Sequence, residues 1–384
     1  MTVGIDKIAF HVPDYFVDMA ELAVARGVDP NKFLIGIGQD KMAVIPKTQD
    51  IITLGANAAA KILTAADKKE IDMVLVGTET GIDYSKSAAV VIQQLLDISP
   101  FVRSYELKHA CYGGTAGLQQ AKEYVLNHPD RKVLVIATDI SKYGLNSGGE
   151  PTQGAGAVAM LVTNNPRILE LSDDNVFYSE NVYDFWRPNG HDYPLVDGHL
   201  SNDIYIEGFK RVWHESNQRH QRSEKDYAAL TFHLPYTKMG RKALQSIFPE
   251  ISEAEQNRLM ECYEESILYS RQVGNLYTGS LYLGLISLLE NSTSLKAGDR
   301  IGLFSYGSGA ISEFFSGRLV EGFKEQLQPA KDEAALAERQ QLNVAEYEAM
   351  FAESLPEDDV ETEFSDSTPY AIRKIAQGIR YYNQ

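Results

Sequence analysis

One cysteine in this chain lies in a local setting that can make its thiol nucleophilic. Cys111 stands between residues 106–110, which we expect to end a strand, and the Gly-rich residues 112–118, where we expect a helix to begin. A cysteine at a helix start lies among unpaired N–H groups at the positive end of the helix dipole, which favours the thiolate. The same N–H groups can stabilise an oxyanion. The sequence therefore predicts a nucleophilic Cys111, with a buried structural cysteine as the alternative.

Two further residues with acid–base side chains follow apolar segments. Glu79 comes after residues 71–77, and His233 comes after residues 227–232. A carboxylate in such a place can act as a general base, especially if burial raises its pKa. A histidine can donate a hydrogen bond to a developing oxyanion. The alternatives are a surface glutamate on a loop and a histidine packed in the core.

Apolar segments typical of strands alternate with helical segments along most of the chain, which favours an α/β fold. The expected elements are strands at 71–77, 132–137 and 156–162 with helices at 87–96 and 111–127, then strands at 227–232, 299–305 and 309–315 with a helix at 274–289. The second half thus weakly repeats the first. We predict two pseudo-twofold-related halves, 1–165 and 166–384, in which Cys111 and Asn275 occupy corresponding helix starts. Chance similarity between α/β units is the alternative.

Two segments fall outside this repeat. Residues 185–222 are rich in Pro, Gly, Asn and aromatic residues, which predicts an insertion of loop and helix. After about residue 328 the chain is expected to be helical and acidic, with residues 356–359 as its most solvated part. A charge run of this kind is usually exposed surface, so no chemistry is assigned to it.

Composition narrows the classes of function. The 384 residues carry 36 basic and 53 acidic side chains, and the net charge of −17 argues against nucleic acids or anionic membranes as main partners. Two cysteines predict neither a disulfide framework nor a cysteine-based zinc site, and we expect no metal. The sequence has no signal-peptide pattern and no apolar run of about 18 residues. We therefore expect a cytoplasmic protein.

Several motifs, taken in order, resemble the hydroxymethylglutaryl-CoA synthase family of bacterial type, within the thiolase superfamily. They lie at residues 4–6, 77–79, 110–113, 147–156, 233–239, 274–280 and 305–309, so the resemblance covers nearly the whole chain. It implies a duplicated thiolase-like fold with α-β-α-β-α layers and a homodimer. It also implies an acyltransferase of the mevalonate route to isoprenoids. Such an enzyme condenses acetyl-CoA with acetoacetyl-CoA and water to 3-hydroxy-3-methylglutaryl-CoA and CoA, with no cofactor besides these CoA thioesters.

The resemblance also implies roles for residues. Cys111 would hold the acetyl group as a thioester, Glu79 would remove its methyl proton, and His233 would stabilise the alkoxide formed from the ketone of acetoacetyl-CoA. Asn275 and Ser308 would line the acetoacetyl pocket, and backbone N–H groups near Cys111 and Ser308 would form oxyanion holes. Further candidates that would pack against or polarise the acyl groups are Tyr143, Thr152 and Asp184. Packing alone explains Tyr143 and Thr152 equally well.

A cluster of basic residues follows the histidine. Lys238, Arg241 and Lys242 are three and four residues apart, which would place them on one face of a helix. In so acidic a chain, this cluster beside His233 predicts a seat for the phosphates of CoA. The alternative is an exposed, solvated helix face.

Other classes of protein compete with this interpretation. A β-ketoacyl synthase or a thiolase would complete its site with two His, with His and Asn, or with a second Cys. Here Glu79 takes that place, and Cys262 lies in an acidic helical segment. A non-catalytic CoA-binding relative would be expected to lack the Cys, the Glu or the His. A Cys–His hydrolase would predict neither a CoA seat nor duplicated halves.

Overall fold

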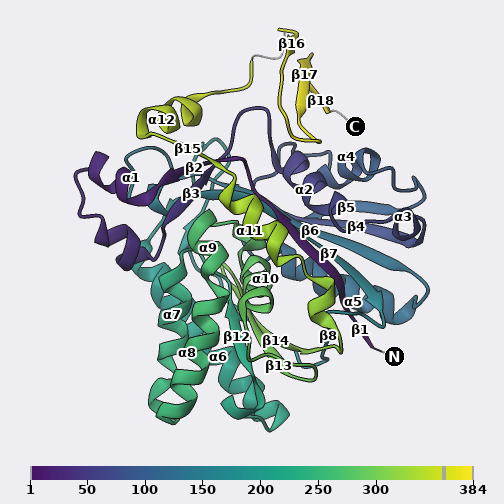
Figure 1. Cartoon of the computed structure of the whole chain (residues 1–384), viewed down its shortest axis with the longest axis vertical. Coiled ribbons are helices and arrows are strands. Elements are labelled where there is room, and N and C mark those ends of the chain that lie inside the picture. The colour runs from purple at the N-terminus through teal and green to yellow at the C-terminus, as the bar shows by residue number, and fades with distance from the viewer. Residues whose placement is uncertain (1, 357–359, 383–384) are drawn as a thin grey trace.

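The computed structural model describes residues 2–356 and 360–382 as an α/β fold built on one mixed sheet (Figure 1). The strand order is β12-β13-β14-β8-β1-β7-β6-β4-β5, and β9 also pairs with β14. The strands of the first half are β1 (Val3–His11), β4 (Ile71–Gly77), β5 (Arg103–Leu107), β6 (Lys132–Ser141) and β7 (Gly154–Asn164). Those that follow are β8 (Leu169–Leu171), β9 (Val176–Ser179), β12 (Ala229–Phe232), β13 (Arg300–Gly307) and β14 (Ile311–Leu319).

The order of strands is the same when the sheet is read inward from either half. β4 is parallel to β6, which is antiparallel to β7, which pairs with β1. Likewise β12 is parallel to β13, which is antiparallel to β14, which pairs with β8. β8 also pairs with β1 and joins the two sets. This symmetry supports the division near residue 165, which stays a prediction.

Three apolar cores separate the helices into layers. In one core, α2 (Ile51–Ala60) and α4 (Ala88–Leu95) pack on β4 and β6. A second core buries α5 (Gly113–Asn127) and α10 (Ser280–Asn291) between strands of both halves. A third joins β12–β14 to α6 (Gly198–His220), α7 (Thr237–Ser246) and α8 (Glu253–Ser266). The layered α/β fold implied by the resemblance is confirmed, with the strands of both halves joined in one continuous sheet.

The remaining elements are shorter or peripheral. They are α1 (Met19–Ala25), η1 (Lys32–Ile37), α3 (Ala65–Glu70), η2 (Glu150–Thr152), η3 (Glu224–Asp226), η4 (Phe248–Glu250), α9 (Leu268–Val273), η5 (Tyr277–Gly279), η6 (Phe323–Gln326) and the strands β2 (Tyr15–Asp18) and β3 (Lys41–Val44). Across residues 2–356 and 360–382, no helix combines the length and the apolar character needed to cross a bilayer.

Both predicted helix starts beside the candidate site are wrong. Cys111 lies before α5, which begins at Gly113 with Tyr112 as its N-cap. Asn275 lies before η5, and α10 begins only at Ser280. The reason is local backbone geometry. The N–H of Tyr112 bonds to the carbonyl of His109 at 2.9 Å, which places Ala110, with φ 40°, and Cys111 inside a tight turn before α5. Tyr277, with φ 44°, likewise turns the chain before α10.

The segment predicted as an insertion holds a hairpin and a helix, and its being an insertion stays a prediction, whereas the tail is more than helical. The insertion contains a short hairpin of β10 (Phe185–Trp186) and β11 (Leu195–Val196), followed by α6. The tail contains α11 (Pro329–Ala337), β15 (Gln340–Leu342), α12 (Val344–Ala352), β16 (Thr362–Glu363), β17 (Ile372–Ala376) and β18 (Ile379–Tyr382). Arg380 and Tyr382 donate hydrogen bonds to Asp50, the N-cap of α2, at 2.7 and 2.8 Å. Of the expected solvated run 356–359, residues 357–359 lie outside the described residues.

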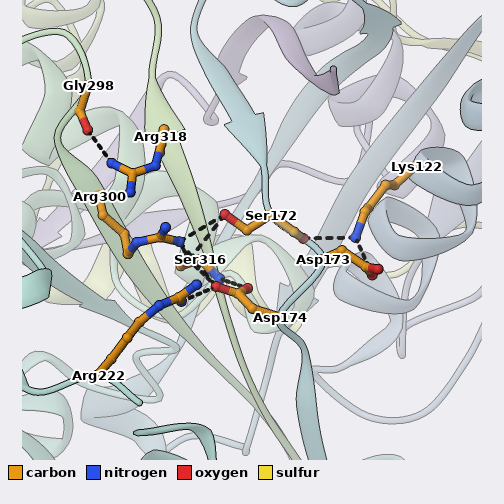
Figure 2. A network of polar contacts seen from close by, with 9 residues as sticks. All are labelled: Lys122, Ser172, Asp173, Asp174, Arg222, Gly298, Arg300, Ser316 and Arg318. Atoms are coloured by element: carbon orange, nitrogen blue, oxygen red, sulfur yellow. Dashed lines mark hydrogen bonds and ion pairs between the residues drawn. The ribbon is translucent and has the colours of Figure 1, made fainter. Parts of the chain in front are cut away.

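A polar network fastens the segment between β8 and β9 (Figure 2). Asp174, with a side chain 3 % exposed, forms ion pairs with Arg222 and Arg300 and accepts a hydrogen bond from the backbone N–H of Ser316 at 3.0 Å. Nearby, Lys122 of α5 donates to the carbonyl of Ser172 at 2.8 Å. The network therefore holds the segment between β8 and β9 against β13, β14 and α5 at once.

This network predicts a large loss of stability in Asp174→Ala. Removing the carboxylate leaves Arg300, which is 9 % exposed, without its counter-charge, and breaking a buried ion pair in this way costs about 3–5 kcal/mol. The matched control is Asp173→Ala, because the Asp173 side chain is 97 % exposed and its pair with Lys122 is weak. Urea unfolding should give a much lower midpoint for the Asp174 variant only. Equal midpoints for the two variants would show that the network does not stabilise the fold.

Candidate active site

The ends of β4 and the segment before α5 bring Glu79 and Cys111 together. A Cβ atom on Gly77 would lie 2.3 Å from the backbone nitrogen of Gly114, so this glycine is what lets the strand end pack on the helix start. The Cys111 Sγ atom lies 3.8 Å from Oε2 of Glu79, within the range of a hydrogen bond donated by a thiol. The nucleophile candidate and the base candidate are therefore direct neighbours.

Both groups of this pair hold their protons more tightly than usual. Burial raises the pKa of the Glu79 carboxyl well above its ordinary value, and the charge of Asp139 adds to the effect. This direction is the one expected for a base. Burial, followed by the charges of Glu79 and Asp139, also raises the pKa of the Cys111 thiol well above its ordinary value. The expected thiolate is thus wrong for the free enzyme, because two neighbouring acids and burial outweigh the field of a helix that begins two residues later.

Asp139, a residue that the sequence reasoning missed, organises this end of the site. Its Oδ1 accepts hydrogen bonds from the hydroxyl of Thr78 at 2.8 Å, the N–H of Glu79 at 2.9 Å and the hydroxyl of Thr80 at 2.7 Å. Its Oδ2 accepts from the N–H of Thr278 at 3.1 Å. The signal in the sequence was a charged residue inside the apolar run 133–140. Because Asp139 is fully buried, these donors are what make its burial tolerable.

The end of β13 brings residues of the second half to Cys111. A Cβ atom on Gly307 would lie 2.6 Å from Cβ of Tyr112, so the loop that carries Ser308 approaches the cysteine loop closely. Asp184, which is fully buried, accepts hydrogen bonds from the hydroxyl of Tyr306 at 2.6 Å and from the N–H of Gly309 at 2.9 Å. Asp184 therefore fixes the loop on both sides of Ser308.

His233 lies at the end of β12, beside the end of β13. Its N–H donates to the carbonyl of Phe304 at 2.8 Å, and its carbonyl accepts from the hydroxyl of Tyr205 at 2.5 Å. Burial lowers the pKa of the ring to about 3, so the imidazole is neutral at physiological pH. Its Nε2 atom is buried and has no hydrogen-bond partner within the described part of the chain. Such an atom is free to form a hydrogen bond with a polar atom of a substrate.

Two other predicted pocket residues belong to the same region. The side-chain oxygen of Asn275 accepts from the N–H of Tyr277 at 2.8 Å and from the hydroxyl of Ser280 at 2.9 Å. The Tyr143 ring packs edge-on against Tyr277 at 6.2 Å, and Cys111 and Glu79 both contribute to the raised pKa of its hydroxyl. Tyr143 and Tyr277 therefore line the side of the site near the catalytic pair. Tyr277 is a further residue that the sequence reasoning missed.

Thr152 has a hydroxyl that is occupied locally. It donates to the carbonyl of Gly149 at 2.8 Å within η2. This bond gives the Thr152 hydroxyl a structural role in the turn. It does not connect Thr152 to Cys111 or Glu79.

The basic cluster lies on α7, directly after His233, as expected. Arg241 forms an ion pair with Glu264 of α8. Lys242 donates to the side chain of Asn202 at 3.1 Å and to the hydroxyl of Tyr236 at 3.3 Å. Lys238 has no hydrogen bond or ion pair to the residues that the structure describes. Lys238 and Lys242 therefore keep an uncompensated charge, whereas the charge of Arg241 is partly neutralised.

Two further observations concern metal-ligand clusters and the second cysteine. The described residues contain no group of three or more His, Cys, Asp or Glu arranged to hold a metal ion. Cys262 is buried in α8, with its Sγ 3.6 Å from the carbonyl oxygen of Ala228.

Comparison with known proteins identifies the family. Residues 1–166 match the family described as hydroxymethylglutaryl-coenzyme A synthase N terminal, and residues 174–264 and 250–383 match its C-terminal counterpart. The chain is 61 % identical to the hydroxymethylglutaryl-CoA synthase of Enterococcus faecalis over 382 residues, covering 100 % of both.

Solved structures agree with this result. A crystal structure of an HMG-CoA synthase complexed with CoA is similar with a TM-score of 0.97 and 47 % identity, over 100 % of both chains. MvaS in complex with 3-hydroxy-3-methylglutaryl coenzyme A has a TM-score of 0.90 and 38 % identity, over 100 % of this chain and 99 % of that one. The chain therefore belongs to the hydroxymethylglutaryl-CoA synthases, thiolase-like acyltransferases that form 3-hydroxy-3-methylglutaryl-CoA in the mevalonate pathway.

Proposed function

We propose that Cys111 carries an acetyl thioester and that Glu79 is the base that turns this acetyl group into a carbon nucleophile. The observation that carries the proposal is the 3.8 Å contact between the Cys111 Sγ and Glu79 Oε2 atoms. An acetyl group on that sulfur has its methyl group within a few bonds of it, so a carboxylate beside the sulfur can reach a methyl hydrogen. A Cys–His hydrolase would instead need an imidazole in this place.

The first half-reaction is acyl transfer. The Cys111 sulfur attacks the thioester carbonyl of acetyl-CoA, the C–S bond to CoA breaks, and the departing CoA sulfur takes up the proton that the Cys111 thiol releases. Backbone N–H groups at Cys111 and in the Ser308 loop are positioned by Asp184 and the close approach at Gly307. These groups are our candidates for stabilising the tetrahedral oxyanion.

The second half-reaction forms the carbon–carbon bond. Glu79 takes a methyl proton from acetyl-Cys111, and the resulting carbanion attacks the ketone carbon of acetoacetyl-CoA. The ketone oxygen becomes an alkoxide, which His233 stabilises by a hydrogen bond from its neutral ring and which then gains a proton. Water finally hydrolyses the thioester to Cys111 and releases 3-hydroxy-3-methylglutaryl-CoA. Asn275, Ser308 and Tyr143 are our candidates for the wall of the acetoacetyl pocket.

Other parts of the proposal concern partners and location. The substrates would be acetyl-CoA and acetoacetyl-CoA, with no cofactor besides, and the enzyme would work in the cytoplasm as a homodimer. Support for a dimer comes from β5, which ends the sheet and is partly exposed, and from Phe101, which precedes it and is 92 % exposed. An edge strand of this kind is a template for pairing with a second copy.

The sharpest test of this mechanism is Glu79→Ala. Removing the carboxylate also removes a charge that raises the pKa of Cys111, so acetylation of the enzyme should persist. Condensation should fall by roughly 10²–10⁴-fold, because no other base is in place for the methyl proton. Mass spectrometry measures acetyl-Cys111, and product formation from acetoacetyl-CoA is followed on the same sample. Cys111→Ala, which should lose both steps, is the control. Condensation near the wild-type rate in Glu79→Ala would exclude Glu79 as the base.

A second test concerns the phosphates of CoA. Lys238→Ala with Lys242→Ala should raise KM for CoA thioesters with little change in kcat, the pattern of lost uniform binding. The effect should shrink for pantetheine thioesters, which lack the distal phosphates. Lys225→Ala is the matched control, because this exposed lysine lies before β12 whereas the α7 cluster follows that strand. An unchanged KM for full-length substrates in the double variant would place the phosphates elsewhere.

A further inference from the structure

Arg187 of the insertion reaches the proposed base from a position that is distant in the sequence. Its Nη2 atom donates a hydrogen bond to the backbone carbonyl of Glu79 at 3.2 Å. Arg187 follows β10 directly and is itself exposed to solvent. A cation at this distance favours the charged form of a carboxylate, and it opposes the effect of burial on Glu79.

The segment before Arg187 is held firmly, so the arginine starts from a defined place. Asp184 is bonded to Tyr306 and Gly309, as described above. The Phe185 ring then packs edge-on against Tyr143 at 6.2 Å and against Tyr277 at 6.0 Å. Residues 184–187 therefore run across the site from the Ser308 loop to the end of β4.

The groups around Glu79 are otherwise acidic or weakly acidic. Asp139 of β6 makes the carboxylate harder to ionise. Burial chiefly raises the pKa values of the Tyr143 and Tyr277 hydroxyls, and the charge of Glu79 adds to both. The Cys111 thiol donates to Glu79 in the free enzyme, but acetylation of the sulfur removes this donor. The guanidinium of Arg187, bonded to the backbone of Glu79, acts against these effects and lowers the pKa of the carboxyl. Its contribution matters most in the acetyl-enzyme, where the base must be ionised.

We propose that Arg187 is a positioning residue for the condensation step, which favours the ionised form of Glu79 and holds its backbone while playing no part in acetyl transfer. This inference rests on the proposed role of Glu79 as the base. Two substitutions separate the positive charge of the arginine from its ability to donate a hydrogen bond. Lysine keeps the positive charge, whereas glutamine keeps a hydrogen-bond donor and loses the charge.

The test is the pH dependence of a single condensation turnover. Enzyme already acetylated on Cys111 is mixed with saturating acetoacetyl-CoA, so that the thiol does not titrate, and product is measured over the pH range in which the fold is intact. A base with a raised pKa loses activity as pH falls through that pKa. In Arg187→Gln the acidic limb of the profile should move to higher pH by up to about one unit. At a given pH on this limb, the rate should then be roughly tenfold lower than in the wild type. The rate should recover at alkaline pH.

Four controls make the outcome decisive. Arg187→Lys should keep the wild-type profile, and so should Arg219→Gln, which removes an exposed arginine at the far end of α6. Acetylation of Cys111 should be unchanged in all three variants. Because Arg187 is exposed, added salt should move the wild-type limb toward that of Arg187→Gln.

The failures of the two proposals are distinguishable. A profile of Arg187→Gln that superimposes on wild type would overturn the inference, and so would an equal loss at every pH in both Arg187 variants, which is the result of a purely structural role. If Glu79→Gln condenses at the wild-type rate, the proposed function of Glu79 fails instead. If Glu79→Gln is inactive and the Arg187→Gln limb does not move, only the role of Arg187 fails.

Discussion

The buried carboxylate of Asp139 is the interaction on which the active site depends. It binds the chain after β4 through Thr78, Glu79 and Thr80, and it binds η5 of the second half through Thr278. A buried charge that loses these donors would be costly, so both segments keep one position relative to β6. The base and the wall that carries Tyr277 are therefore placed by a single group that touches neither substrate in the proposed reaction.

Placing three acidic groups in one enclosed region has an electrostatic consequence. The pKa values of Cys111, Glu79 and Asp139 are all raised, so the free site is reluctant to accumulate negative charge. Acetylation removes the titrating thiol and also removes the hydrogen bond that it donates to Glu79. The carboxylate then becomes more basic, because its charged form has lost a donor. Such a site gains a stronger base at the stage when a methyl proton has to be removed.

Much of the scaffold could be predicted from the sequence. The strand at Ile71–Gly77 was predicted with its observed bounds, because parallel strands buried on both faces are continuous apolar runs. The helix starts beside Cys111 and Asn275 could not be predicted, since positive φ angles at Ala110 and Tyr277 leave no clear mark in residue type. The strands of the tail were missed for a similar reason. β18 is held by contacts of Arg380 and Tyr382 with Asp50, more than 300 positions away in the chain.

The sequence by itself determined which chemical groups are present and in what local setting. Cys111, Glu79 and His233 each follow a segment predicted to be a strand, and their order and motifs resemble those of a CoA-dependent condensing enzyme. Only the tertiary structure decided their protonation and their partners. Burial and two neighbouring acids keep the Cys111 thiol protonated, Asp139 places Glu79, and Arg187 reaches it from the insertion. These effects depend on short distances between the groups and on the exclusion of water. Residues far apart in the sequence come close together, away from water, only when the chain is folded.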